Sequence, residues 1–331
     1  MNTKLGICIP TYKRPEQLYA CVQSIIAAAA PFEVPIFIAD DSADTTNKHV
    51  FQKLCSEYPH IFITTNRENL GIDGNILNSV NICTCEYAWM LGEDDRLEAD
   101  GIQTVLPLLD KHSGDEWPFF FINYASVDAD IKLYLNERVL DINEDIIEPT
   151  EVFLTQHSWA AGFIGGCIVN TKLWNAIDQK QYVGTYFAHV GTIMEMLHAS
   201  QVYLVARPLV LNRCGEPRLF TWSDSTFNVA GGWKEMMTLL ESTYTPQLCE
   251  QAVKQFETAH GLYTFRFLCY ARADYAYRLK HYHEFIKPLC RSITYTSIAK
   301  LIACTPPQLF KVIRFVITGY RRIANPAVTT F

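Results

Sequence analysis

The sequence predicts an α/β protein with a doubly wound, mostly parallel sheet, followed by a smaller helical C-terminal region. Short apolar runs alternate with stretches of helical periodicity over the first hundred residues, which is the pattern of parallel strands joined by helices. Polar clusters follow these runs, and in such sheets ligands bind beyond the carboxyl ends of the strands. After about residue 216 the strand-like runs give way to helical periodicity.

The first hundred residues contain four expected strands and three expected helices. Residues 5–9 form a short apolar run that Pro10 ends, and a helix is expected over 15–30 with Pro15 in its first turn. Further strands are expected at 34–39, 61–65 and 87–91, with helices between them at about 45–57 and 73–82. Parallel pairing would bring the carboxyl ends of these strands to one edge of the sheet.

The second half of the sheet is expected to use strands at 119–122, 162–169 and 202–211. Glycine and proline residues supply breaks beyond them, and we place a domain boundary at residue 215. Residues 1–215 then form the α/β domain, with halves at 1–100 and 101–215, and residues 216–331 form the helical region.

The composition is that of a globular chain and argues against several classes of protein. Hydrophobic residues make up 49% of the 331 residues, and the net charge of −7 argues against nucleic-acid binding, which needs a basic surface. No stretch reaches the ~18 apolar residues of a transmembrane helix, and the early first strand leaves no room for a signal peptide. The eleven cysteines include no CxxC pair, so free thiols in a reducing cytosol are expected.

Basic residues are concentrated near the C-terminus. Between Lys280 and Phe331 eight lysines and arginines accompany one acidic residue. Residues 298–323 form a tail in which apolar side chains follow the Pro306-Pro307 break at helical spacing. A basic amphipathic helix can lie in the interface of a membrane with anionic lipids. We therefore expect peripheral membrane contact through this tail; a helix docked on the domain with solvated charges is the alternative.

Four motifs stand in order at the predicted strand ends. They are CIPTYKR at residues 8–14, ADDS at 39–42, NLGIDGN at 69–75 and MLGEDDR at 90–96. Their order and spacing resemble the family-two glycosyltransferases with the GT-A fold, closely over 1–100 and more loosely to about 215. The third motif, which continues with Ile76, resembles the subgroup that includes the O-antigen abequosyltransferases.

The resemblance implies an inverting transfer of a sugar from a nucleotide-diphosphate sugar donor to a hydroxyl of a glycan acceptor, including a lipid-linked one. It implies bacterial surface polysaccharide assembly, such as that of O-antigen or capsule, by a cytoplasmic protein on the inner face of the inner membrane. A nucleotidyltransferase that makes activated sugars is one alternative, although residues 10–14 lack the glycines of its phosphate loop. A non-catalytic sugar-nucleotide-binding protein is the other.

The acidic motif carries most of the expected chemistry. Carboxylates at the end of a strand suit Mn²⁺ or Mg²⁺, and such a metal neutralises charge on the departing diphosphate. Gly92 stands where the family has the first acid of its Asp-x-Asp motif, so Asp94 becomes the best metal ligand. Glu93 and Asp95 are its expected helpers, through the ribose or through water, and Asp95 is the second expected metal ligand. A solvated acidic turn is the alternative.

The other motifs supply the donor contacts that the resemblance implies. The Tyr12 ring would stack on the base, and Arg14 would reach a phosphate or lie in solvent. Asp40 and Asp41 would accept hydrogen bonds from base or ribose, or would cap a turn. The expected nucleotide-sugar contacts are Pro10, Thr11, Tyr12, Arg14, Asp40, Asp41, Asn69, Gly71, Asn75, Glu93, Asp94 and Arg213.

An inverting transfer also needs a base for the acceptor hydroxyl. The family supplies an acidic pair after a Gly-Gly strand and a helix, which Gly165-Gly166 and the residues that follow resemble. The pair then falls at Ala188-His189, where no acid is present, so His189 and Glu195 are the candidate bases. An acid outside the motif is an alternative, and so is a core role for His189.

Overall fold

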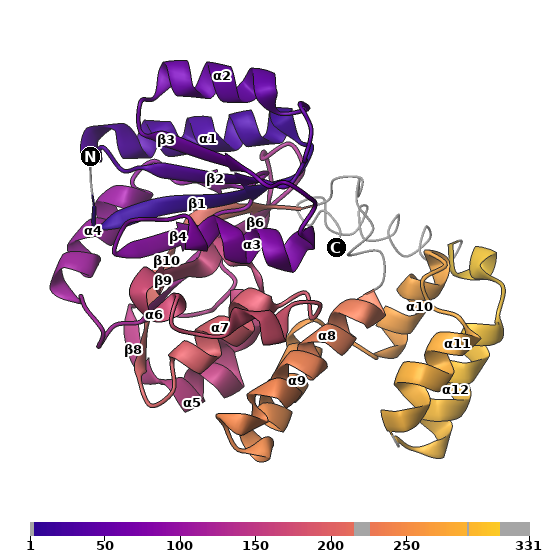
Figure 1. Cartoon of the computed structure of the whole chain (residues 1–331). Helices are drawn as coiled ribbons and strands as arrows, with labels where there is room; N and C mark the ends of the chain where they lie inside the picture. Colours follow the sequence, from indigo (N-terminus) through magenta and orange to yellow (C-terminus); the bar gives the residue numbers. More distant parts are fainter. Residues whose placement is uncertain (1–2, 215–225, 290, 312–331) are drawn as a thin grey trace. The chain divides into compact units, whose positions relative to one another are not determined.

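A computed structural model describes residues 3–214, 226–289 and 291–311 of the chain (Figure 1). The chain divides into two compact units: unit 1 comprises residues 1–216 and 232–252, and unit 2 comprises residues 217–231 and 253–331. Unit 1 contains the sheet, whereas the described part of unit 2 is helical. The expected fold class is confirmed; the boundary at residue 215 stays a prediction.

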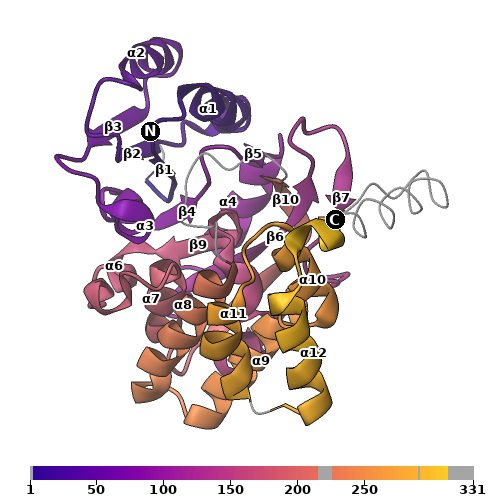
Figure 2. The same cartoon turned by 90° about the vertical axis from the view of Figure 1, so that its right-hand side faces the viewer.

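The first seven principal elements alternate between strand and helix, as the apolar pattern predicts. They are β1 (Leu5–Thr11), α1 (Pro15–Ala29), β2 (Ile36–Asp40), α2 (Lys48–Glu57), β3 (Ile61–Thr65), α3 (Gly71–Asn81) and β4 (Tyr87–Met90). The four strands are parallel in the order β3-β2-β1-β4. Figures 1 and 2 show α1 and α3 on opposite faces of these strands, which explains why β1 and β2 are apolar on both faces.

The sheet continues with mixed strand directions. Its full order is β3-β2-β1-β4-β9-β6-β10-β5, with β7 paired to β6 and β8 paired to β10. The added strands are β5 (Arg96–Leu97), β6 (Phe119–Val127), β7 (Tyr134–Asn136), β8 (Ile146–Pro149), β9 (Cys167–Asn170) and β10 (Gln201–Arg213). The short strand β9 runs antiparallel to both β4 and β6, whereas β10 is parallel to β6.

The expected strand over 162–169 is wrong in its first half. Two 3₁₀ turns, η3 (Ser158–Gly162) and η4 (Ile164–Gly166), occupy this stretch, and the strand begins only at Cys167. A side chain at Gly166 would approach the Phe121 ring and the backbone of Ile122, so the glycine permits this close turn. The Gly165 carbonyl accepts a hydrogen bond from Trp89 Nε1 at 2.9 Å, which attaches the turn to the end of β4.

The helices of the second half complete both units. Between β5 and β10 lie α4 (Gly101–Lys111), α5 (Thr150–Val152), α6 (Thr171–Trp174) and α7 (Ala188–Met196). Beyond the sheet lie α8 (Thr226–Leu239), α9 (Pro246–Ala259), α10 (Phe265–Ala273), α11 (Leu279–His281) and α12 (Ile293–Cys304). In unit 2 the buried Phe227 ring stacks on Tyr277 and His281, with centroids 5.5 and 5.3 Å away. Among the described residues no helix is long and apolar enough to span a membrane.

The ten described cysteines are free thiols. Most are buried, and burial raises the pKa of the Cys21 thiol well above its usual value, which makes it inert. Cys55 on α2 and Cys304 at the end of α12 are exposed. Each unit therefore contains one exposed thiol among its described residues.

Candidate active site

Glu93 joins the ends of β1 and β4. Its carboxylate accepts hydrogen bonds from the Thr11 hydroxyl and from the Tyr12 N–H, the latter at 2.9 Å. Burial raises the pKa of Glu93 to about 7, although both hydrogen bonds oppose this shift. The first and fourth motifs therefore meet at one edge of the sheet, as the parallel topology predicts.

Arg14, which directly precedes α1, pairs with the acidic motif. Its Nη1 lies 2.7 Å from Asp94 Oδ2 and 3.6 Å from Glu93 Oε1. The Arg14 side chain is 13% exposed, so the alternative that it lies in solvent is wrong. Asp94 is the more accessible partner, with 28% of its side chain exposed.

Asp95 turns inward beneath Gly92. Its Oδ1 accepts the backbone N–H of Arg213 at 3.0 Å, which brings the end of β10 to the acidic motif. A Cβ atom at Gly92 would collide with Asp95 Oδ2. The Asp95 carboxylate thus occupies the space that a side chain at position 92 would need. Burial and the neighbouring Asp94 raise the pKa of Asp95.

These carboxylates suit a metal ion that substrate phosphates also bind, rather than one held by protein side chains alone. Among the described residues no group of three or more His, Cys, Asp or Glu side chains is arranged to hold a metal ion. Mg²⁺ and Mn²⁺ nevertheless bind through one or two carboxylates when substrate phosphates complete the coordination. The accessible Asp94 beside the inward-facing Asp95 fits this second mode.

Asp40 and Asp41 both hold loops. Asp40 Oδ1 accepts hydrogen bonds from Ser42 Oγ at 2.6 Å and from Asn47 Nδ2 at 2.9 Å. The Asp41 carboxylate accepts the N–H groups of Leu70 and Gly71, at 2.7 and 3.1 Å. Both side chains are buried, and burial raises the pKa of Asp41. The turn-forming alternative therefore describes both residues, and their contact with the donor stays a prediction.

Asn75 joins α3 to two strand ends. Its Nδ2 donates to the carbonyl oxygens of Thr11 at 3.2 Å and Ala39 at 3.1 Å. Its Oδ1 accepts from Asn66 Nδ2 at 3.0 Å, and the same Asn66 amide also bonds to Asp41. This buried amide network fixes the relative positions of β1, β2 and α3, and a contact between Asn75 and the nucleotide stays a prediction.

Gly71 leaves open space at the start of α3. Its φ of +73° lies in the left-handed region, and a Cβ added there would meet no atom within 4 Å. The Asn69 side chain accepts the Gly71 N–H at 2.8 Å, so both predicted residues shape the same turn. Asn66 and Asn47 were missed, although Asn66 directly follows β3 and thus carried the same signal as the other strand-end residues.

Comparison with known proteins identifies the domain that carries these motifs. The family description "Glycosyl transferase family 2" matches residues 6–163. Residues 6–163 are therefore similar to family 2 glycosyltransferase domains. The match confirms the resemblance seen in the four motifs, and it ends before Gly165, His189, Glu195 and Arg213.

A curated relative supports the same family. The abequosyltransferase RfbV of Salmonella typhimurium (strain LT2) is 27% identical over 228 residues. The similar region covers 63% of this chain and 66% of the relative, so the chain spans slightly less than two thirds of that protein. The chain is therefore similar to an enzyme of the predicted subgroup.

Solved structures show the same fold at low sequence identity. TarS of S. aureus, residues 1–349 in complex with UDP-GlcNAc, superimposes with a TM-score of 0.61 at 13% identity, covering 86% of this chain and 81% of that one. The mannosyltransferase PcManGT from Pyrobaculum calidifontis, in complex with GDP-Man and Mn²⁺, gives a TM-score of 0.50 at 13% identity, covering 95% and 87%. Both comparisons concern the fold alone.

His189 lies beyond the matched glycosyltransferase segment and inside the core. The residue is 1% exposed, and its Nε2 lies 3.1 Å from the Ala161 carbonyl oxygen. Burial lowers the pKa of His189 to about 4, partly offset by the charge of Asp73. This is the geometry of a hydrogen-bonded core histidine, and its role as the base stays a prediction.

Glu195, the second candidate base, lies at the opposite end of α7. Its Oε2 accepts hydrogen bonds from the Tyr182 hydroxyl at 2.8 Å and Gln181 Nε2 at 2.9 Å. The structure therefore places the two candidates at different ends of one helix, and they do not share a site.

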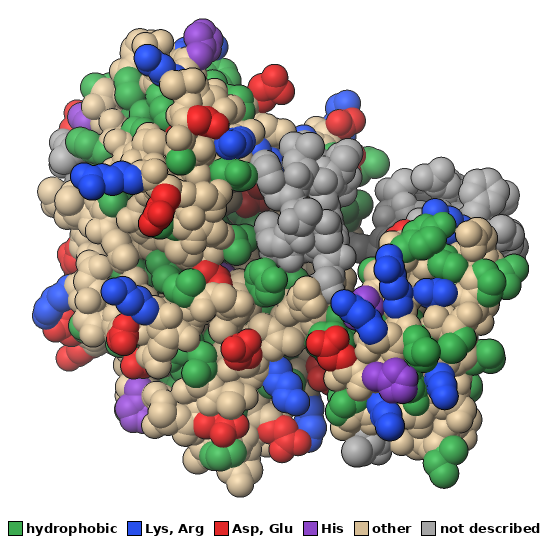
Figure 3. Space-filling model, turned by 45° about the vertical axis from the view of Figure 1, so that its right-hand side comes forward, with side chains coloured by type: hydrophobic (Ala, Val, Ile, Leu, Met, Phe, Trp, Pro, Cys, Tyr) green, Lys and Arg blue, Asp and Glu red, His purple; other side chains and the backbone are tan. Residues whose placement is uncertain are grey.

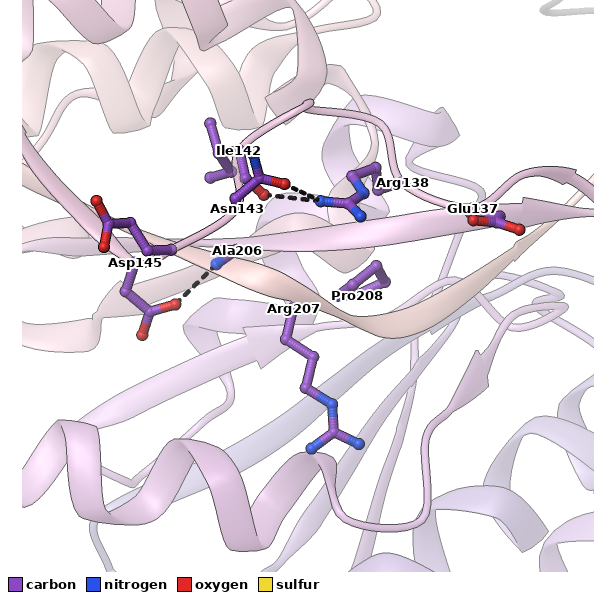
Figure 4. Close-up of a pocket in the computed structure, with 9 residues that line it drawn as sticks. Glu137, Arg138, Ile142, Asn143, Asp145, Ala206, Arg207 and Pro208 are labelled. Atoms are coloured by element: carbon purple, nitrogen blue, oxygen red, sulfur yellow. Dashed lines mark hydrogen bonds between the residues drawn. The ribbon is translucent and has the colours of Figure 1, made fainter.

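One cavity of about 420 Å³ lies away from the acidic motif, where the loop before β8 faces the irregular stretch of β10 (Figure 4). Arg138 Nη1 donates to the Ile142 carbonyl and to Asn143 Oδ1 at 3.1 Å, while Asp145 Oδ1 accepts the Ala206 N–H at 2.9 Å. None of the predicted site residues lines this cavity. The polar groups of this cavity bond to the stretch of β10 where its pairing with β6 is irregular, and not to the site at the strand ends.

Proposed function

We propose that the chain transfers a sugar, with inversion, from a nucleotide-diphosphate sugar to a hydroxyl of a glycan acceptor in bacterial surface polysaccharide assembly, such as that of O-antigen or capsule. The family 2 domain and the abequosyltransferase relative support this proposal. The observation that carries it is the convergence of the first and fourth motifs, with an accessible Asp94, at the carboxyl edge of the parallel strands.

Asp94, assisted by Asp95, is the proposed ligand of Mn²⁺ or Mg²⁺. When bound with the donor, the metal would supply Lewis-acid stabilisation of the departing diphosphate. In the structure Arg14 forms an ion pair with Asp94. A metal ion bound to Asp94 would take the place of Arg14 in that pair. The Arg14 guanidinium would then be available for a phosphate oxygen, which reconciles its observed pairing with its predicted contact.

The other donor contacts are proposed as predicted. Pro10, Thr11 and Tyr12 would line the base, and Glu93 would fix their position through its hydrogen bonds to Thr11 and Tyr12. Asp40, Asp41, Asn69, Gly71, Asn75 and Arg213 would complete the donor site.

His189 and Glu195 remain the proposed candidates for the base. The Nε2–H of His189 donates to the Ala161 carbonyl, which leaves Nδ1 as a neutral acceptor with no hydrogen-bond partner among the described residues. That protonation state suits a base, but the atom is buried. Acceptor binding would have to expose it.

Donor titration with and without Mn²⁺ tests the proposal. We expect nucleotide-sugars to raise the melting temperature of the parent more strongly with Mn²⁺, and Asp94→Asn to lose the Mn²⁺-dependent part. Asp110→Asn, which changes an exposed acid on α4, is the matched control and should behave like the parent. A parent that responds to no nucleotide-sugar would overturn the proposal, and an Mn²⁺-independent response would overturn the role of Asp94.

The buried His189 and the missing acid favour one second candidate, a non-catalytic sugar-nucleotide-binding protein. Donor binding without turnover in the presence of glycan acceptors would identify it. Transfer of labelled sugar to any acceptor would exclude it.

We also propose that the second unit contacts an anionic membrane, where a lipid-linked acceptor would be presented. The described residues of unit 2 contain nine lysines and arginines against three acids. On α12, Ile293 is 86% exposed and Leu301 is 66% exposed, and the helix contains no acidic residue. Figure 3 shows hydrophobic and basic side chains close together on the visible face of this unit. Residues 312–323 of the predicted tail lie outside the described residues.

Vesicle sedimentation of the full chain tests this contact. We expect binding to phosphatidylcholine vesicles only when they contain phosphatidylglycerol, and about tenfold weaker binding for Leu301→Ser. Leu133→Ser, at a residue of unit 1 that is 50% exposed, is the matched control and should bind like the parent. Equal binding to neutral vesicles, or unchanged binding by Leu301→Ser, would contradict the proposal; concentration-dependent dimerisation abolished by Leu301→Ser would instead identify a second copy as the partner.

A further inference from the structure

Asp73 is a buried carboxylate that reaches across unit 1 to one downstream segment. It lies in the first turn of α3 and is 4% exposed. Its Oδ2 accepts the N–H groups of Gly184 at 2.8 Å and Tyr186 at 2.9 Å, and its Oδ1 accepts that of Ala188 at 3.2 Å. Three backbone groups that lie 111 to 115 residues away along the chain therefore converge on one side chain.

The segment 184–188 is held in an unfavourable conformation. Tyr186 has a φ of +67°, in the left-handed region, which costs a non-glycine residue roughly 1–2 kcal/mol. Phe187, which precedes α7, has no side-chain acceptor for the first N–H groups of that helix. Asp73 replaces the missing cap from a distant element, and its negative charge at the helix N-terminus is favourable.

The two helices that Asp73 links, α3 and α7, are attached through turns to different strands of the sheet. On one side, α3 begins at the Gly71 turn that Asp41 holds at the end of β2. On the other side, α7 places His189 against Ala161 in η3, shortly before the Gly165 turn that bonds to Trp89 in β4. Asp73 therefore connects α3, which borders the proposed donor site, to the segment 184–188 that directly precedes the predicted base His189.

We propose that Asp73 is a positioning residue, which holds segment 184–188 and the start of α7 in register with the donor site. This inference rests on the proposed transfer function. Without the three hydrogen bonds the segment would relax from its left-handed conformation, whereas the donor site would keep its own contacts through Glu93, Arg14 and Asp41. Donor binding would survive, and the acceptor hydroxyl would no longer be aligned with the sugar.

Asp73→Ala and Asp73→Asn test the inference against a matched control. Asp145→Asn alters another carboxylate that anchors a loop, through the Ala206 N–H and the Tyr203 hydroxyl, but it lies at the cavity of Figure 4. We expect Asp73→Ala to keep its donor affinity within about twofold while kcat for transfer falls about 100-fold, the usual effect of misalignment. Asp73→Asn keeps one acceptor oxygen and should fall in between, and Asp145→Asn should match the parent.

Two further measurements separate positioning from a general loss of stability. The ratio of donor hydrolysis to transfer should rise in Asp73→Ala, since water needs no alignment by this segment. Amide hydrogen exchange of residues 184–188 should speed up in the Asp73 variants and stay slow in Asp145→Asn. Unchanged exchange at 184–188, or an equal loss of donor affinity and of transfer, would overturn the inference. Exchange is measured without substrates, so a parent that transfers no sugar would defeat the proposed function alone.

Discussion

The proposed donor side of the strand edge and the region around His189 are organised differently. On the proposed donor side, motifs within the first hundred residues follow adjacent parallel strands, and the side chains of Glu93, Asp41 and Asn75 bond to backbone groups of the other motifs. Around His189, the decisive contacts come from Asp73 in α3 and from Ala161 in the turn η3, and neither residue directly follows a strand. Chemistry placed at the ends of successive strands follows from topology, whereas chemistry assembled by distant packing does not.

The largest expected effect tests the donor side of this comparison. Asp94→Asn should lower kcat for transfer by about 100-fold or more in Mn²⁺, because the amide cannot replace the carboxylate as ligand for the metal at the diphosphate. Its melting temperature without ligand should change little, since Asp94 is partly exposed. Steady-state kinetics beside Asp110→Asn would check this, and equal activity of both variants would contradict it.

A second prediction concerns the region around the buried His189. The neutral form of His189 is favoured in the folded state, where its pKa is about 4 instead of 6.5. The unfolded chain therefore binds a proton first as pH falls, so this contribution is present above pH 6.5 and is lost between pH 6.5 and 4. It amounts to about 3 kcal/mol. Urea unfolding at pH 7 and pH 5 should show this loss in the parent and a smaller one in His189→Gln.

The same His189→Gln variant sharpens the question of the base. A base would give a loss of about 100-fold in kcat at unchanged donor affinity, and a core histidine would give lower stability with near-parental kcat per folded molecule. Equal pH dependence of unfolding in parent and variant would show that the imidazole does not titrate as its burial requires.

The smallest expected effect concerns Gly92, where the motif departs from the family. Restoring a side chain there should not restore a second metal ligand, because Asp95 Oδ2 occupies the space. Gly92→Ala should lower the free energy of unfolding by about 2 kcal/mol through overpacking. Gly92→Asp should weaken Mn²⁺-dependent donor binding rather than strengthen it. Tighter Mn²⁺-dependent binding by Gly92→Asp would show that Asp95 moves aside without cost.

Much of the fold was predictable because β1 and β2 are apolar on both faces and the connecting helices have clear periodicity. The short β9 was not, since the apolar Gly-rich run at 162–169 has the composition of a strand but folds into turns against Trp89. At the site, the positions of Glu93 and Asp94 followed from the end of β4. The burial of His189 and the hydrogen bonds of Asp73 depend on how helices and turns pack, and no strand end marks these positions in the sequence.

The described residues include two exposed thiols, which can report which unit contacts a membrane. Cys55 lies on α2 in unit 1, and Cys304 lies at the end of α12 in unit 2, beside the exposed Leu301. A water-soluble maleimide would react with both in solution. If α12 faces lipid, vesicles would shield Cys304 and leave Cys55 reactive, so the unmodified chain would report its own orientation at a membrane.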